Sequence, residues 1–227
     1  MARYTRLQVL TIMIETGLVP LFYHDDPDVA AKVIQACLDG GARCIEYTNR
    51  GDGAHLVFTE LVRRFQGDPR LILGAGTILD PATAALFLQL GANFIVGPTF
   101  NQELARLCNM RMVPYTPGCA TTTEISRAQE LGVEICKIFP GRELGGPAFI
   151  QAVRAPLPWS RLMPTGGVNP DKENVRAWIL AGAACLGMGS KLISARGIAA
   201  GEYPAITENV RKVLQWIQEA RAEEPAS

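Results

Sequence analysis

The chain has 227 residues, of which 48% are hydrophobic and 19% are charged, a composition typical of an ordinary globular protein. Basic and acidic residues number 22 each, so the formal net charge is zero. Nucleic acids and anionic membranes attract proteins with a basic excess, so this balance argues against both as partners. The length suits one α/β barrel, and we expect residues 1–227 to form a single domain.

The N-terminal segment, residues 1–17, predicts an amphipathic helix. Glu15 interrupts its apolar run and no small-residue cleavage site follows, which argues against a signal peptide. No stretch approaches the ~20 apolar residues that a transmembrane helix needs. Six cysteines are scattered without a CxxC pair, which favours buried thiols in a reducing compartment. We therefore expect a cytoplasmic protein.

Short β-type runs alternate with helical runs along the whole chain. Amphipathic stretches such as Asp28–Asp39 and Pro81–Leu90 separate the predicted strands. Asp80-Pro81 and Asn169-Pro170 are typical helix starts, with a capping side chain before a proline. The predicted strands are Leu18–Tyr23, Cys44–Thr48, Leu71–Ala75, Phe94–Pro98, Met112–Thr116, Glu134–Pro140, Arg161–Thr165 and Cys185–Gly189.

This alternation predicts the fold class. Strands separated by helices form parallel sheets, and eight such strands in a chain of this size predict a (β/α)8 TIM barrel preceded by the N-terminal helix. An open doubly wound sheet is the alternative, but no GxGxxG motif opens a helix after an early strand. Only residues 222–227 are expected to fray.

Lys137 is the most informative residue because it interrupts the apolar strand Ile135–Phe139. An isolated ammonium in such a place costs several kcal/mol unless it is paired or loses its proton. Desolvation favours the neutral amine, which is the form that attacks a carbonyl carbon. The sequence thus predicts a lysine that can form a Schiff base with a carbonyl substrate.

Glu46 is the second charged residue inside an apolar strand, and it shares one strand face with Thr48. A carboxyl group there can move protons during Schiff-base formation and at the enamine carbon. The alternative is a purely structural ion pair between Glu46 and Lys137. The two interpretations are compatible, because a catalytic pair can also be an ion pair at rest.

Sites in barrels form at the C-terminal ends of the strands, where several polar residues gather. Arg50 follows the second strand and suits capture of a substrate carboxylate, and the hydroxyl of Thr77 offers a further contact. The run Thr165-Gly166-Gly167, together with Ser190, is typical of an anion-binding loop. These glycines equally serve tight turns, and they do not decide between a phosphate and a carboxylate.

Metal chemistry is not expected. The two histidines, His24 and His55, show no HxH or HExxH spacing, and both are interpreted as rim or surface residues.

Two strings resemble the active-site signatures of the 2-keto-3-deoxy-6-phosphogluconate / 4-hydroxy-2-oxoglutarate aldolases, the small class I pyruvate aldolases. They are GGARCIEYTNRG (40–51) and GVEICKIFPG (132–141). The strings GAGTILDP (74–81), PGCATTTE (117–124) and PTGGVNP (164–170) occur in the same order at fitting distances. The resemblance covers roughly residues 15–217.

The resemblance implies roles for particular residues. Lys137 would be the Schiff-base nucleophile and Glu46 the general acid and base. Arg50 and Thr77 would bind the pyruvyl carboxylate, Pro98 and Phe139 would shape the pocket, and Thr165, Gly166, Gly167 and Ser190 would hold the distal end of the substrate. The resemblance also implies a homotrimer that needs no cofactor and no metal.

Two other functions remain open alternatives. One is a phosphate-binding barrel isomerase or synthase in which Lys137 only neutralises charge, and the other is a trimeric scaffold or sensor without activity. The identity and stereochemistry of the substrate, and any accompanying decarboxylase activity, are not determined by the sequence.

Overall fold

The computed structural model of the protein describes residues 2–223. The helices are α1 (Arg6–Thr16), α2 (Pro27–Asp39), α3 (Ala54–Arg64), α4 (Pro81–Gln89), α5 (Gln102–Met110), α6 (Thr122–Glu130), α7 (Pro147–Arg154), α8 (Lys172–Leu180), α9 (Ala195–Ala199) and α10 (Tyr203–Ala222). The strands are β1 (Leu18–Phe22), β2 (Cys44–Thr48), β3 (Ile72–Gly76), β4 (Ile95–Val96), β5 (Tyr115–Thr116), β6 (Gly118–Cys119), β7 (Ile135–Ile138), β8 (Arg161–Pro164) and β9 (Leu186–Met188). Over the described range, no helix has the length and apolar character required to cross a bilayer.

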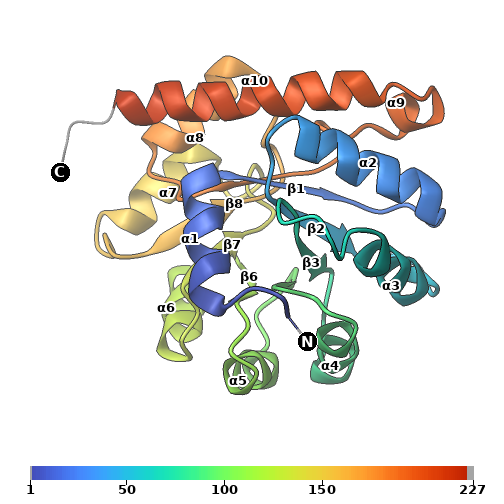
Figure 1. Ribbon diagram of the computed structural model, residues 1–227. Helices are drawn as coiled ribbons and strands as arrows, with labels where there is room; N and C mark the ends of the chain where they lie inside the picture. The colour runs from blue at the N-terminus through green and yellow to red at the C-terminus, as the bar shows by residue number, and fades with distance from the viewer. Residues whose placement is uncertain (1, 224–227) are drawn as a thin grey trace.

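All strand pairs are parallel, and the strands lie in two sheets with the orders β5-β4-β3-β2-β1-β9 and β6-β7-β8. Together the strands form a parallel sheet that curls into a half-barrel, with helices around its outside (Figure 1). The α/β class with a parallel sheet is therefore confirmed. Two short junctions link the sheets: Pro117 alone separates β5 from β6, and an isolated bridge pairs Thr165 with Gly187.

Helix starts follow local capping chemistry. Asp80 caps α4 by accepting the N–H of Thr83, as the Asp80-Pro81 pair predicts. The start predicted at Asn169-Pro170 is wrong, because α8 begins two residues later with Asp171 as its cap. The N–H of Asn169 instead donates to the Asn174 side chain, which holds this segment as a turn.

Several other predicted boundaries also shift by one or more residues. The strand predicted over Met112–Thr116 forms only at its end, because Met112 has a φ of 52°, in the left-handed region that strands exclude. Phe139 and Pro140 lie beyond the end of β7. Ala222 is the last residue of α10, so it is helical, whereas residues 224–227 lie outside the described range.

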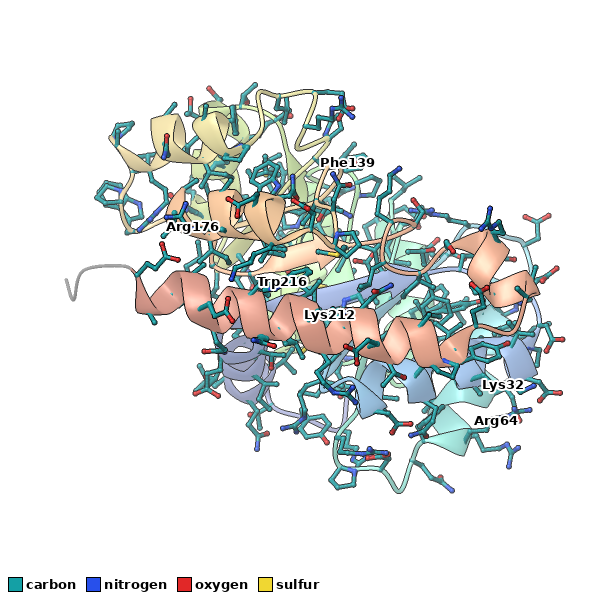
Figure 2. The ribbon with its side chains drawn as sticks, turned by 90° about the horizontal axis from the view of Figure 1, so that it is seen from above. Lys32, Arg64, Phe139, Arg176, Lys212 and Trp216 are labelled. Carbon is teal, nitrogen blue, oxygen red and sulfur yellow. The ribbon has the colours of Figure 1, made fainter. Side chains whose placement is uncertain are left out.

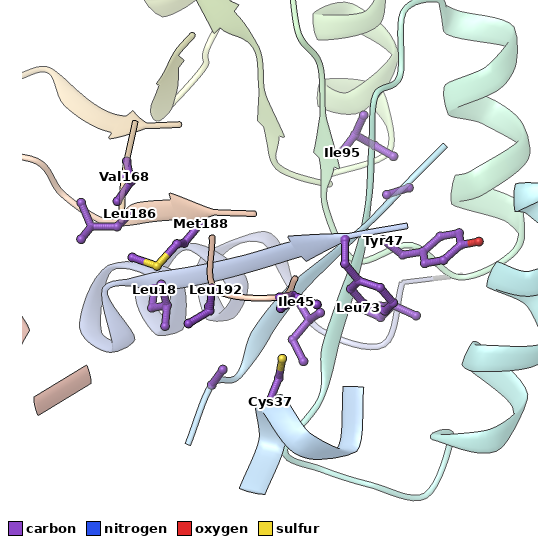
Figure 3. Packing of buried hydrophobic residues seen from close by; sticks show 14 of the residues in the cluster. Leu18, Cys37, Ile45, Tyr47, Leu73, Ile95, Val168, Leu186, Met188 and Leu192 are labelled. Carbon is purple, nitrogen blue, oxygen red and sulfur yellow. The ribbon is translucent and has the colours of Figure 1, made fainter. Parts of the chain in front are cut away.

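The apolar core has two parts. The larger part lies between the sheet and the surrounding helices, where Leu18, Ile45 and Leu73 pack near Cys37 of α2 (Figure 3). The smaller part lies on the inner face of the curled sheet, where Val9, Leu10 and Met13 of α1 pack on the first inward residues of the strands. In Figure 1, α1 crosses the end of the sheet that faces the viewer. Helix α1 thus closes the N-terminal end of the strands and leaves their C-terminal end for a site.

Candidate active site

Strand alternation points both predicted catalytic residues inward. On β2, Cys44 belongs to the inner cluster, whereas Ile45 and Tyr47 belong to the outer one. A period of two therefore places Glu46 on the inner face. The same argument holds for β7, where Ile135 lies inside and its neighbour Cys136 outside, so that Lys137 also faces inward.

The Lys137 side chain is buried, with an exposed fraction of 6%. Its Nζ atom lies 5.1 Å from the centroid of the Phe139 ring, a cation–π distance when the amine is charged. Among residues 2–223, the amine forms no ion pair with any carboxylate, so the structural ion pair with Glu46 is absent. Lys137 is therefore a desolvated amine that no carboxylate neutralises at contact distance.

The Glu46 carboxyl group is buried as well, with an exposed fraction of 1%. Neither carboxyl oxygen has a hydrogen-bond partner among the described residues. Burial raises the pKa of Glu46, whereas the positive charges of Lys137 and Arg50 act in the opposite direction. A carboxyl group whose pKa is raised in this way is suited to hold a proton and release it to a reacting group.

Gly76 makes room for this carboxyl group. Gly76 pairs with Thr48 on the neighbouring strand, next to the position of Glu46. A Cβ atom added at Gly76 would lie 1.8 Å from Glu46 Oε1 and 2.4 Å from Glu46 Cδ. The side chain of Glu46 therefore occupies the space that the side chain of any residue other than glycine would fill at position 76.

A cavity of about 530 Å³ opens at the C-terminal ends of the strands. Six of the ten residues predicted for the site line it, namely Arg50, Phe139, Thr165, Gly166, Gly167 and Ser190. Phe139 connects the cavity to the buried amine, because its ring lies over Lys137 Nζ. In Figure 2, the labelled Phe139 lies apart from α10, the helix to which the labelled Lys212 and Trp216 belong. Arg50 forms no ion pair with a carboxylate of residues 2–223, which leaves its guanidinium free for an anion.

The loop after β8 has the geometry of an anion-binding turn. Gly166 and Gly167 have φ values of 89° and 75°, which only glycine adopts readily. No acceptor within residues 2–223 faces the backbone N–H of Gly167 or that of Ser190. The hydroxyl of Thr165 is buried and has no hydrogen-bond partner within residues 2–223. It fits there because residue 187 is a glycine, since a Cβ atom added at Gly187 would lie 2.2 Å from Thr165 Oγ1.

Thr77 and Pro98 are half-buried but do not line the cavity. Thr77 has a φ of 59°, a left-handed conformation that is strained for a threonine and that is found preferentially at functional sites. Lys137 and Glu46 are likewise absent from the lining because both lie deeper, on the inner face of the sheet.

Sequence reasoning missed several residues around the cavity. Tyr23 and Lys191 line it, and so does Ile198 of the short helix α9, whereas His24, which the sequence placed at the rim or surface, also lines it. The position of Tyr23 at the end of the first predicted strand was an available signal, whereas the contribution of α9 depends on contacts between residues far apart in the chain. Thr116 was also missed. Its hydroxyl is buried without a partner, and its neighbour Tyr115 belongs to the outer cluster, so Thr116 faces inward.

Comparisons with known proteins agree with this geometry. The family model of KDPG and KHG aldolases matches residues 9–209. The chain is 33% identical to a 2-dehydro-3-deoxy-phosphogluconate aldolase of Treponema pallidum, over 87% of this chain and 92% of the relative. It is 30% identical to a KHG/KDPG aldolase of Escherichia coli, over 89% of this chain and 93% of the relative.

A solved structure extends the comparison to the chemistry. It is a KDPG aldolase from Legionella pneumophila with pyruvate captured as a covalent carbinolamine intermediate, and it superposes with a TM-score of 0.82 at 25% identity. The alignment covers 90% of this chain and 97% of that one. From the family match and the curated relatives, we conclude that this chain belongs to the KDPG and KHG aldolase family and is a carbon–carbon lyase acting on a small molecule.

Proposed function

We propose that the chain is a class I aldolase that cleaves a 2-keto-3-deoxy-6-phospho sugar acid, or 4-hydroxy-2-oxoglutarate, to pyruvate and an aldehyde. The observation that carries the proposal is that a buried amine, Lys137, and a buried carboxyl group without a hydrogen-bond partner, Glu46, lie on the same inner face of the strands. Such an arrangement is costly for folding, and it supplies both a nucleophile and a proton carrier.

The reaction starts when the neutral Lys137 amine attacks the C2 carbonyl carbon of the substrate. The carbinolamine then loses water, and Glu46 in its protonated form donates a proton to the departing hydroxyl. The resulting iminium accepts the electron pair of the C3–C4 bond as that bond breaks, while the C4 hydroxyl gives its proton to the Glu46 carboxylate and the aldehyde leaves. Protonation of the enamine at C3 and hydrolysis of the imine release pyruvate and the free lysine.

Other residues position the substrate in this proposal. Arg50 and Thr77 bind the carboxylate next to the ketone, and Phe139 and Pro98 bound the pocket around the imine. The distal end of the substrate lies against the anion-binding turn, which comprises Thr165, Gly166, Gly167 and Ser190. The free N–H of Gly167 and the left-handed backbone of the two glycines support this assignment.

We also infer that the two sheets form one closed eight-stranded barrel and a single domain. Lys137 N–H donates to the carbonyl of Pro117 at 2.8 Å, so β5 and β6 act as one interrupted strand beside β7. The bridge between Thr165 and Gly187 joins β8 to β9. These two junctions support closure around the polar interior.

The proposal includes a homotrimer in the cytoplasm that works without a metal. The lysine mechanism needs no Lewis acid, and residues 2–223 contain no group of three His, Cys, Asp or Glu side chains close enough to hold a metal ion. The six cysteines are buried free thiols, which fits a reducing compartment.

Reduction of the imine tests the function. Incubation with pyruvate and borohydride should attach a reduced pyruvyl group to Lys137, and peptide mapping should locate it there. The matched control is Lys191, which lines the same cavity. Lys191→Ala should keep the adduct and Lys137→Ala should lose it. A folded Lys137→Ala protein that still forms the adduct, or a wild-type protein that forms none, refutes the mechanism and favours an isomerase or synthase without an imine.

A further inference from the structure

A second cavity, of about 520 Å³, lies at the opposite end of the strands from the candidate active site. We call it the basal cavity. It is bounded by the end of α1 at Ile14 and Glu15, the end of α7 at Arg154, and the first residue of β8, Arg161. Its volume lies within the range of small-molecule sites. None of the catalytic residues proposed above contributes to it.

The charge of the basal cavity is strongly positive. Its lining contains three arginines, Arg154, Arg161 and Arg221, and a single acidic residue, Glu15. None of the three guanidinium groups forms an ion pair with a carboxylate of residues 2–223, although many other arginines of the chain do. Convergence of unpaired arginines in one concave site favours an anionic ligand.

Arg154 and Arg221 are held in different ways. Arg221 donates to the carbonyl oxygens of Ile14, Glu15 and Ala184 at 2.7, 2.8 and 3.0 Å, so its position is fixed by the backbone. Arg154 has a buried Nε atom without any partner. Arg154 Nη1 occupies the space beside Gly182, where a Cβ atom would lie 1.7 Å away. Arg154 thus has no ion-pair partner within residues 2–223, and its buried Nε is an unsatisfied donor, an arrangement that costs free energy.

Trp159 adds an aromatic surface. Its side chain lines the basal cavity and is 67% exposed, although it is one of the largest apolar groups of the chain. An exposed indole beside cationic groups is suited to stack on a planar ring. Glu15 offers acceptors for hydroxyl or amino donors of the same ligand.

From this combination we propose that the basal cavity binds a nucleoside monophosphate. Arg154 and Arg161 bind the phosphate, and Trp159 stacks on the base. The site is separate from the aldol chemistry and does not depend on it.

Calorimetric titration with adenosine monophosphate tests the proposal. Wild-type protein should bind one equivalent saturably. The double variant Arg154→Gln/Arg161→Gln should bind about 100-fold more weakly, roughly tenfold for each guanidinium removed. The matched control is Arg111→Gln, at an exposed arginine outside the lining, which should bind like wild type. Neither Arg154 nor Arg161 anchors the backbone through a side-chain hydrogen bond within residues 2–223, so the double variant should fold, as circular dichroism will check.

The phosphate and the base are tested separately. Trp159→Leu should weaken binding of adenosine monophosphate and leave binding of inorganic phosphate unchanged. Equal binding by the double variant and wild type overturns the proposal, because it places the ligand elsewhere, for example at the anion-binding turn of the active site. Absence of saturable binding overturns it too. Inorganic phosphate that binds as tightly as adenosine monophosphate contradicts the role given to the base.

Discussion

The inner face of the sheet has two layers that differ by a single step of strand alternation. In the lower layer, Cys44 and Ile135 pack against α1 in a sealed apolar cluster. Two residues further along the same strands, Glu46 and Lys137 form a buried polar upper layer, in which the Glu46 carboxyl oxygens have no hydrogen-bond partner within residues 2–223. The lower layer stabilises the fold, whereas the upper layer destabilises it by burying polar groups that the proposed reaction uses. Strand period alone places the two functions next to each other.

The largest expected effect is the loss of kcat when Glu46, in the upper layer, is substituted. Glu46→Gln keeps the shape of the side chain but removes the proton-transfer group, so kcat for aldol cleavage should fall by roughly 10²- to 10⁴-fold. The imine with pyruvate should form more slowly, since Glu46 assists the loss of water from the carbinolamine, but borohydride should still trap it because Lys137 is untouched. Steady-state kinetics on a phosphorylated 2-keto-3-deoxy acid measures the effect. An unchanged kcat would remove Glu46 from the mechanism.

A lower-layer change should do the opposite. Ile135 is fully buried, and Ile135→Ala should destabilise the fold by about 2–5 kcal/mol because it leaves a cavity. The kcat of the protein that remains folded should stay close to wild type. Urea unfolding and active-site titration by borohydride trapping separate the two quantities. A large loss of kcat per trapped site would show that the layers are not independent.

Gly76 affects both packing and catalysis, because the Glu46 carboxyl group packs directly against it. Gly76→Ala should displace the Glu46 carboxyl group, reduce kcat at least tenfold, and cost about 1–3 kcal/mol through overpacking. Gly53→Ala is the matched control, since an added Cβ there meets nothing within 4 Å and Gly53 has a φ of −88°. Kinetics and urea unfolding of both variants test this. Similar kcat values for the two variants would contradict the positioning of Glu46 over Gly76.

The smallest expected effect is a pH dependence of stability. Burial raises the pKa of Glu46 above its unfolded value of 4.5, so the folded state binds a proton that the unfolded state has lost. This contribution to stability is complete below pH 4.5 and is lost as the pH rises towards the folded pKa. Glu46→Gln should therefore gain stability relative to wild type as the pH increases, by ~1.4 kcal/mol for each pH unit between the two pKa values. Urea unfolding from pH 4.5 to neutrality measures the difference, and a constant difference would argue against a raised pKa.

Local patterns predicted much of this molecule. The strand Cys44–Thr48 matches β2 in both bounds, and Glu46 and Lys137, the two charged residues noted inside apolar strands, are both buried on the inner face. The strand predicted from Met112 failed because the left-handed backbone at that residue is set by its turn and not by its apolar side chain. The start at Asn169-Pro170 failed because Asp171, and not Asn169, caps the helix by accepting the backbone N–H of Asn174.

Long-range contacts account for most of what the sequence could not predict about the site. The absence of an ion pair at Lys137 depends on the separation of two strands that are far apart in the chain. The contribution of α9 to the cavity lining depends on how the chain after β9 folds back over the C-terminal ends of the strands. The binding roles of Thr77 and Pro98 stay predictions, since neither residue lines the cavity.

Hydrogen exchange at the methyl group of pyruvate tests the central claim most directly. A lysine imine converts pyruvate to an enamine, and a proton carrier then returns a solvent proton to the methyl carbon. In D₂O, the proton NMR signal of the methyl group should disappear with wild-type protein, decay more slowly with Glu46→Gln, and persist at the background rate with Lys137→Ala. Wild-type exchange rates in a folded Lys137→Ala protein would contradict a reaction through the buried amine.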